Sequence, residues 1–419
     1  MKTNHHRKKF FTSLGSFLLA ATILLNCTSC TLRVSAAELS AGYSRKATEQ
    51  GTVDDTFITA LSDFSLSLLR ESLKKDGSND LISPLSAALC LAMLANGAGD
   101  NTKVQMENVL GIDTNSLNKA LYSYISGLYT ADSCKVNLAN SIWFRDADKD
   151  RISKDFLQTN ADWYDAQIYS APFDSTTVKD INKWVKHYSD GMIDSILSQI
   201  PPSTVMYLIN ALTFDAKWET KYEKKDIREK LFTNYNKSQA TTQMMYSEES
   251  IYLSDKGVQG FAKNYSGGQY SFVALLPEEG KDIYEYAASL TGDAWRSLWK
   301  SKTTDSVQVS IPEFSYDRQR SLIGVLSKLG TTDMFDETLA DFSGLAPHDS
   351  LYCSEVNQKV FIQVDRNGTK AAAITWAGMN KSSAMIEDQK TVYLDRPFLY
   401  AIADNNTGLP LFLGIITTL

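Results

Sequence analysis

Apolar residues recur every three to four positions in the first half of the chain, which is the spacing of an amphipathic helix. The clearest helical stretch covers residues 57–73. Residues 85–94 are apolar on nearly every side, and Ser83–Pro84 places a hydroxyl cap and a first-turn proline before them. The pattern therefore predicts a central, buried helix over 83–96. Further helices are predicted over 120–128, 153–163 and 181–197.

Strand patterns dominate the second half of the chain. Residues 206–214 are almost continuously apolar, as in a strand that is covered on both faces. Helices and strands are mixed without strict alternation, which favours an α+β fold over a doubly wound sheet. Other strands are predicted over 135–144, 271–276, 306–311, 360–364, 391–394, 398–404 and 410–416.

One segment near the C-terminus has an unusual alternation. It follows the strand at 360–364 and ends in the polar stretch 380–383, where a protease could bind. Successive side chains of a strand point to opposite faces, so one face of this segment would carry only small groups and could slide against a packed core. The pattern indicates a loop that can become a strand. The small residues are Thr369, Ala371, Ala373, Thr375 and Ala377.

Composition and charge narrow the classes of function. The chain has 419 residues, 43% of them hydrophobic, and a formal net charge of −7 without a basic stripe. The charge argues against nucleic acid as a partner. No linker or repeat interrupts the chain after about residue 55, so we expect one folded unit over 55–419, acting as a monomer.

The N-terminus has the features of an export signal. A basic start is followed by the apolar stretch 10–25 and by the small residues Ser35-Ala36-Ala37. We expect cleavage after residue 37, a flexible segment over 38–54 and a secreted protein. Lipid attachment at Cys30 or Cys27, which would anchor the protein to the cell surface, is the second interpretation.

The sequence does not favour an enzyme. Beyond the signal region the only histidines are His187 and His348, and no HExxH, GxSxG, GxGxxG or phosphate-loop motif occurs. The acidic run 146–150 lacks the glycine and closing glutamate of a calcium loop. Cys90, Cys134 and Cys353 form no CxxC pair. We expect neither a metal nor a cofactor.

Several motifs together resemble the serpin family of protease inhibitors, over about residues 55–419. The segment 392–402, VYLDRPFLYAI, fits the family signature at every constrained position. The resemblance implies a single α+β domain with three β-sheets, about nine helices and an exposed reactive-centre loop at about 366–390. The other motifs, in chain order, are Ile82–Ser86, Asn210 with Lys217-Trp218-Glu219, Leu329-Gly330 before Met334-Phe335, Asp341–Gly344 and Pro410–Gly414.

The resemblance also implies a mechanism and its residues. A serpin is a suicide substrate: the protease forms an acyl bond to the loop, which inserts into the large sheet and distorts the enzyme. Gly368, Thr369, Ala371, Ala372 and Ala373 match the hinge where insertion begins. The loop length places the attacked bond at Ser382-Ser383, which suits an elastase-like or subtilisin-like protease; Lys381, which would suit a trypsin-like protease, and Met385 are alternatives.

The region where the sheet opens matches Ser83, Ser86, Asn210, Trp218 and Gln358. Family members often have histidine where this chain has Gln358, and we expect its amide to bond Asn210 or Ser86 without pH sensitivity. At the base of the loop the family's usual charges are exchanged, so we predict an ion pair of reversed polarity between Arg366 and Glu313. In the competing interpretation, the protein has the same fold but does not inhibit proteases, and it acts as a chaperone, a carrier or a plain protease substrate.

Overall fold

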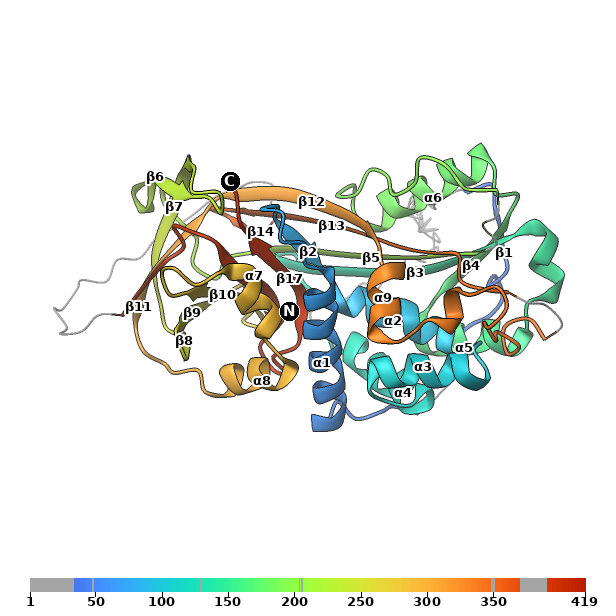
Figure 1. The fold of residues 1–419 in the computed structure, drawn as a ribbon. Helices are drawn as coiled ribbons and strands as arrows, with labels where there is room; N and C mark the ends of the chain where they lie inside the picture. Colours follow the sequence, from blue (N-terminus) through green and yellow to red (C-terminus); the bar gives the residue numbers. More distant parts are fainter. Residues whose placement is uncertain are drawn as a thin grey trace, which may run out of the picture. The chain divides into compact units, whose positions relative to one another are not determined.

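The computed structural model describes residues 34–46, 49–128, 130–202, 204, 206–347, 351–369 and 390–419. Its strands form three sheets, and Figure 1 shows the long strands β3, β5, β13 and β12 running side by side. The large sheet has the order β1 (Ala37–Glu38), β4 (Gln167–Ala171), β3 (Cys134–Arg145), β5 (Met206–Lys217), β14 (Gly368–Thr369), β13 (Glu355–Asp365) and β12 (Phe314–Ser321).

Two smaller sheets complete the strand framework. Most residues in the strands of the second sheet are buried in the core. The third sheet lies at one end of the long strands in Figure 1. In order, the second sheet contains β2 (Asp80–Ile82), β17 (Pro410–Ile416), β16 (Phe398–Asp404), β10 (Tyr270–Pro277), β9 (Val258–Asn264) and β8 (Tyr252–Asp255), and the third β15 (Lys390–Tyr393), β11 (Val307–Pro312), β7 (Gln239–Glu249) and β6 (Ile227–Thr233).

The described residues contain nine α-helices, so the α+β fold with three sheets is confirmed. Three 3₁₀ turns accompany them, at Asp146–Arg151, Lys224–Asp226 and Asp333–Phe335. In chain order the helices are α1 (Asp55–Ser72), α2 (Pro84–Ala95), α3 (Asp100–Leu110), α4 (Thr114–Ser126), α5 (Lys154–Tyr164), α6 (Ser175–Tyr188), α7 (Ile283–Ser289), α8 (Gly292–Lys300) and α9 (Ile323–Leu329).

The predicted buried helix is α2. All twelve of its residues are buried, and the Ser83 hydroxyl accepts a hydrogen bond from the Ser86 backbone N–H at its start. The helix predicted over 181–197 is displaced, because α6 spans Ser175–Tyr188. The chain leaves the helix where Asp190 (φ 50°) and Gly191 (φ 75°) adopt left-handed backbone conformations, which a helix does not tolerate.

Residues on both sides of the expected cleavage point after Ala37 make regular contacts. Ala37 and Glu38 pair with β4, and the Leu39 N–H donates to the Ile168 carbonyl at 2.6 Å. Just before them, the Ser35 N–H donates to the Asp180 carboxylate at 2.7 Å. The sequence does not reveal β1, because this strand pairs through backbone groups and not through side chains. Its hydrogen bonds satisfy the free backbone groups at the edge of β4. No helix among the described residues is long and apolar enough to cross a membrane.

Candidate functional site: the base of the loop and the strands that flank it

The large sheet holds the start of the predicted hinge between its two central strands. Gly368 pairs with Lys217 of β5 on one side and with Asp365 of β13 on the other, and Thr369 continues both ladders by one residue. At the far end, β5 and β13 pair with each other directly through Glu355 and Val356. Within the described residues, no backbone ladder joins β5 to β13 or β14 between these two ends. The sheet therefore has a place for a further strand between β5 and β13.

Three consecutive backbone carbonyls at the base of the loop are held by two aromatic residues. The indole Nε1–H of Trp218 donates to the Asp365 carbonyl at 2.8 Å. The backbone N–H of Tyr222 donates to the Arg366 carbonyl at 3.2 Å, and that of Trp218 to the Asn367 carbonyl at 2.9 Å. The turn between β13 and β14 is thus fixed before the loop begins.

A third aromatic residue holds the hinge threonine. The Tyr265 and Thr369 hydroxyls are 2.5 Å apart, and Tyr265 stacks on Trp218 with ring centroids 4.7 Å apart. Burial raises the pKa of Tyr265 well above its usual value, so the phenol stays neutral and can donate or accept this hydrogen bond. We call Trp218, Tyr222 and Tyr265 the loop cradle.

Gly368 leaves no room for a side chain. A Cβ atom built on it would lie 1.9 Å from the Ala216 carbonyl oxygen and 2.7 Å from the Lys217 Cα. Both atoms belong to the backbone of β5, which cannot rotate away as a flexible side chain would. A glycine is therefore required for β14 to enter the sheet at this position.

The structure brings Arg366 and Glu313 together at the outer side of the turn. Arg366 Nε lies 3.3 Å from Glu313 Oε1, with the reversed polarity that the sequence predicts. The side chains are 45% and 26% exposed, so the pair is solvated and contributes little to stability. Its use in positioning the loop stays a prediction.

Gln358 does not bond Asn210 or Ser86, so the partners predicted for it are wrong. Its Oε1 accepts from the Ser83 N–H at 3.1 Å, and its Nε2 donates to the Ser83 carbonyl at 2.8 Å. The Ser83 hydroxyl in turn donates to the Leu411 carbonyl at 3.0 Å. Ser83 is the N-cap residue of α2, so its N–H has no helical acceptor and is free to pair with an amide, whereas its carbonyl accepts from both Gln358 Nε2 and the Ala87 N–H at 3.2 Å. We call Ser83, Ser86 and Gln358 the α2 cap cluster.

Asn210 lies in the middle of β5 and is almost fully buried. Its Nδ2 donates to Asn140 Oδ1 at 2.5 Å, whereas its own Oδ1 has no hydrogen-bond partner among the described residues. Trp218 is eight residues farther along the chain, just past the end of β5 and about 26 Å away at the usual rise of a strand. The five residues predicted to act where the sheet opens therefore fall at two separate places.

The other predicted loop residues lie outside the described residues: Ala371, Ala372, Ala373, Lys381, Ser382, Ser383 and Met385, as does His348. The predicted thiols are unreactive by environment, since burial raises the pKa values of Cys90 and Cys134 to about 12. His187 packs at the edge of the Tyr188 ring on α6. In the part of the chain that the structure describes, no three His, Cys, Asp or Glu side chains are grouped to hold a metal.

Comparison with known proteins decides the family. A family model described as serpin (serine protease inhibitor) matches residues 59–419. The chain belongs to the serpin family. The family is described by inhibition of serine proteases and not by catalysis, which supports protease inhibition as the general function and shows that the protein is not an enzyme.

Relatives and solved structures agree with this assignment. Serpin B8 of Bos taurus is 30% identical over 374 residues, which cover 86% of this chain and 98% of that protein. The leukocyte elastase inhibitor of Equus caballus is 29% identical, covering 85% and 97%. The crystal structure of the thermophilic serpin tengpin in its native state superposes with a TM-score of 0.87 at 44% identity, covering 92% of this chain and all of that one.

Proposed function

We propose that this serpin traps its protease by inserting the cleaved loop as a new strand between β5 and β13. The observation that supports this most strongly is β14, where Gly368 and Thr369 already pair with both neighbours. Insertion would lengthen a ladder that exists instead of starting one. Starting a strand costs chain entropy before any contact rewards it, so a preformed start favours fast insertion.

The existing register indicates where each inserted residue would lie. Thr369 faces Ala216 on β5 and Val364 on β13, and its side chain points into the core toward Tyr265. If both ladders continue, Ala371, Ala373, Thr375 and Ala377 follow on the same side because side chains alternate. These are the residues that the sequence identifies as small, which fits a strand that must enter a packed core.

The same register brings Thr375 between Asn210 on β5 and Gln358 on β13. Both neighbours are buried, and the Oδ1 of Asn210 has no partner among the described residues. A hydroxyl at this position can donate to that oxygen, which removes the cost of a buried, unpaired acceptor. Insertion would therefore complete hydrogen bonding in the middle of the sheet.

The chemical step belongs to the protease. Its serine oxygen would attack the carbonyl carbon of Ser382 and form an ester, while the bond to Ser383 breaks and the new amine takes the proton that the protease's histidine removed from the serine. Insertion then carries the ester away before water can hydrolyse it. A small residue at the attacked bond suits an elastase-like or subtilisin-like protease, whereas Lys381 would suit a trypsin-like one. Met385 is the third candidate.

One experiment tests this mechanism. The purified protein is mixed separately with pancreatic elastase, subtilisin and trypsin, and the products are separated in SDS and sequenced. We expect an SDS-stable covalent complex with elastase or subtilisin and a released peptide that begins at Ser383. Cleavage without a complex would instead support a non-inhibitory serpin, and an intact loop with all three proteases would exclude the proposal.

We also propose that the protein acts outside the cytoplasm as a monomer. The basic and apolar start of the chain and the small residues before Glu38 support export. N-terminal sequencing of protein secreted by its host tests this, with Glu38 as the expected first residue. An acylated Cys27 or Cys30 would indicate a lipid anchor instead.

A further inference from the structure

A buried ion pair lies beneath the loop cradle. Lys263 is on β9 of the second sheet and Glu249 is at the end of β7 of the third sheet. Lys263 Nζ lies 2.7 Å from Glu249 Oε1, and the side chains are only 2% and 12% exposed. The pair therefore links two sheets at the place where the large sheet receives the loop.

The ammonium group of Lys263 contacts two of the three cradle residues. Its Nζ lies 4.6 Å from the centre of the Tyr222 ring and 5.5 Å from that of the Trp218 ring. A cation near an aromatic face is attracted by the ring, and more strongly when it is shielded from water. The position of Lys263 and the positions of both rings are thus coupled.

A second route joins the carboxylate to the cradle. Glu249 Oε1 also accepts from the Ser247 hydroxyl at 2.6 Å, and the Ser247 hydroxyl lies 3.1 Å from the Tyr222 hydroxyl. Tyr222 and Trp218 are the residues whose backbone N–H groups hold the Arg366 and Asn367 carbonyls. The ion pair is therefore two contacts away from the turn at the base of the loop.

We propose that Lys263 and Glu249 are positioning residues for loop insertion: they hold Trp218 and Tyr222 so that the turn between β13 and β14 is already formed when the protease attacks. This inference rests on the proposed insertion mechanism. Removing one partner of a buried pair leaves the other charge without compensation. The cradle must then open to admit water, and its hold on the carbonyls at residues 365–367 weakens.

The test compares Glu249→Gln and Lys263→Met with the double variant. Each single change leaves one buried charge, whereas the double variant leaves none and keeps the side-chain volumes similar. In the protein alone, hydrogen exchange at the Trp218 and Tyr222 amides reports the cradle directly. We expect both amides to exchange at least about tenfold faster in the single variants and to return to near the wild-type rate in the double variant.

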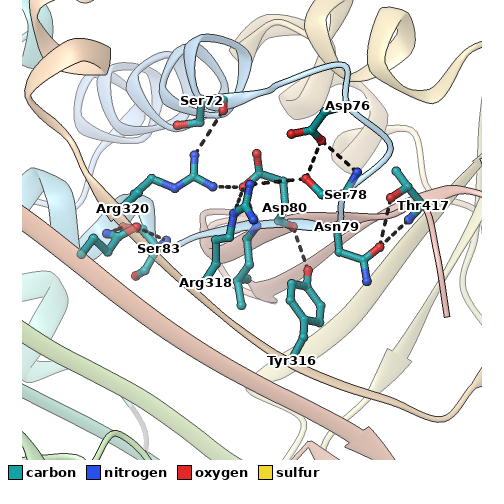
Figure 2. Close-up of polar contacts among 12 residues, drawn as sticks. Ser72, Asp76, Ser78, Asn79, Asp80, Ser83, Tyr316, Arg318, Arg320 and Thr417 are labelled. Carbon is teal, nitrogen blue, oxygen red and sulfur yellow. Dashed lines mark hydrogen bonds and ion pairs between the residues drawn. The ribbon is translucent and has the colours of Figure 1, made fainter. Parts of the chain in front are cut away.

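A buried ion pair elsewhere provides a control, and its carboxylate keeps a second cation, since Arg318 Nε lies 4.0 Å from Asp80 Oδ1. Asp80 and Arg320 are 2% and 14% exposed, and Figure 2 shows the carboxylate of Asp80 against the Arg320 guanidinium, which also donates to the Ser72 carbonyl. Arg320 pairs across the sheet with Gln358, whereas the cradle lies beyond the opposite end of β13. Arg320→Gln should lower overall stability without selectively accelerating exchange at Trp218 and Tyr222.

The second measurement is the number of inhibitor molecules cleaved for each protease trapped. We expect this number to rise at least about threefold in the single variants, because slower insertion gives water time to hydrolyse the ester, and to recover in the double variant.

Unchanged amide exchange in the single variants, equal acceleration in Arg320→Gln, or no recovery in the double variant would each overturn the inference. If the single variants do not fold, a double variant that folds with wild-type exchange supports it and one with fast exchange overturns it. If the wild-type protein traps no protease, the proposed function fails, while the exchange experiment still decides whether the pair positions the cradle.

Discussion

The loop cradle and the α2 cap cluster lie at different positions along β13 and hold it in different ways. In the cradle, Trp218 and Tyr222 satisfy three consecutive carbonyls of the loop base, and Tyr265 holds Thr369. Near the α2 cap cluster, Gln358 is fully engaged with Ser83, but the neighbouring Asn210 keeps one oxygen without a partner among the described residues. The hydrogen bonds of the cradle are complete in the structure, whereas Asn210 Oδ1, near the α2 cap cluster, lacks a partner among the described residues that an inserted strand would supply under the proposed function.

We infer that two positions along β5, its end beside the cradle and its middle at Asn210, have different roles in the proposed mechanism. Under the proposed function, the complete turn at one end would define the register of the inserted strand, and the unpaired Asn210 oxygen in the middle would favour the inserted state. A native fold usually leaves few buried polar atoms unpaired, so each exception requires a reason. Under the proposed function, the reason for the Asn210 exception is the hydroxyl of Thr375.

The largest expected effect comes from Gly368→Ala, which would disrupt the packing of β14 against β5 beside the loop cradle. The new methyl group would lie 1.9 Å from the Ala216 carbonyl oxygen, so β14 and β5 must separate. We expect the free energy of unfolding to fall by about 2–3 kcal/mol, since overpacking and lost ladder bonds both contribute. Denaturant unfolding measures this, and the variant should be cleaved by elastase without forming a complex.

A matched glycine separates crowding from a general effect of alanine. A Cβ atom added to Gly324 in α9 would meet no atom within 4 Å, so Gly324→Ala should keep stability within about 1 kcal/mol and keep trapping intact. If Gly368→Ala behaved in the same way, the close approach of β14 to β5 would not matter for insertion.

An intermediate effect is expected at the other region, from Gln358→His. An imidazole cannot easily reproduce both amide hydrogen bonds to Ser83, so we expect a loss of about 1–3 kcal/mol at pH 7.5. Burial would lower the pKa of this histidine below its unfolded value of about 6.5. A group whose pKa is lowered on folding contributes stability that disappears as the pH falls, so the variant should weaken further below about pH 6.5.

The wild-type protein is the reference for this pH dependence. A glutamine does not titrate, so the difference in unfolding free energy between variant and wild type should grow as the pH falls from 7.5 to 5.5. A constant difference over that range would mean that residue 358 is not buried as the structure shows, or that the imidazole reaches water.

The two regions also differ in how far the sequence predicted them. The hydroxyl cap and proline at Ser83–Pro84 predict α2, because that signal is local. Thr369, the first residue of the small alternation, is buried in β14, and the rest of the alternation lies outside the described residues. The partner of Gln358 was predicted wrongly because it depends on which backbone groups lie opposite β13. Nothing local identified Lys263 as a buried cation, since its partner Glu249 comes from another sheet.

The smallest expected effect concerns the exposed pair at the turn, Arg366 and Glu313. Arg366→Glu places two carboxylates side by side, and we expect a loss of less than about 1 kcal/mol because both side chains are in contact with solvent. Glu313→Lys in the same chain restores an ion pair with opposite polarity. Unfolding free energies of the two single variants and the double variant, measured at low and high salt, give the coupling between the two positions.

The sign and salt dependence of that coupling decide what the pair does. A favourable coupling that shrinks at high salt, together with recovered trapping in the double variant, would show that the exposed ion pair helps to fix the turn between β13 and β14. The buried cradle residues fix the same turn from the core side. Additive losses would mean that Arg366 and Glu313 are merely neighbours. The cradle alone would then position the loop, as its buried bonds to three consecutive carbonyls suggest.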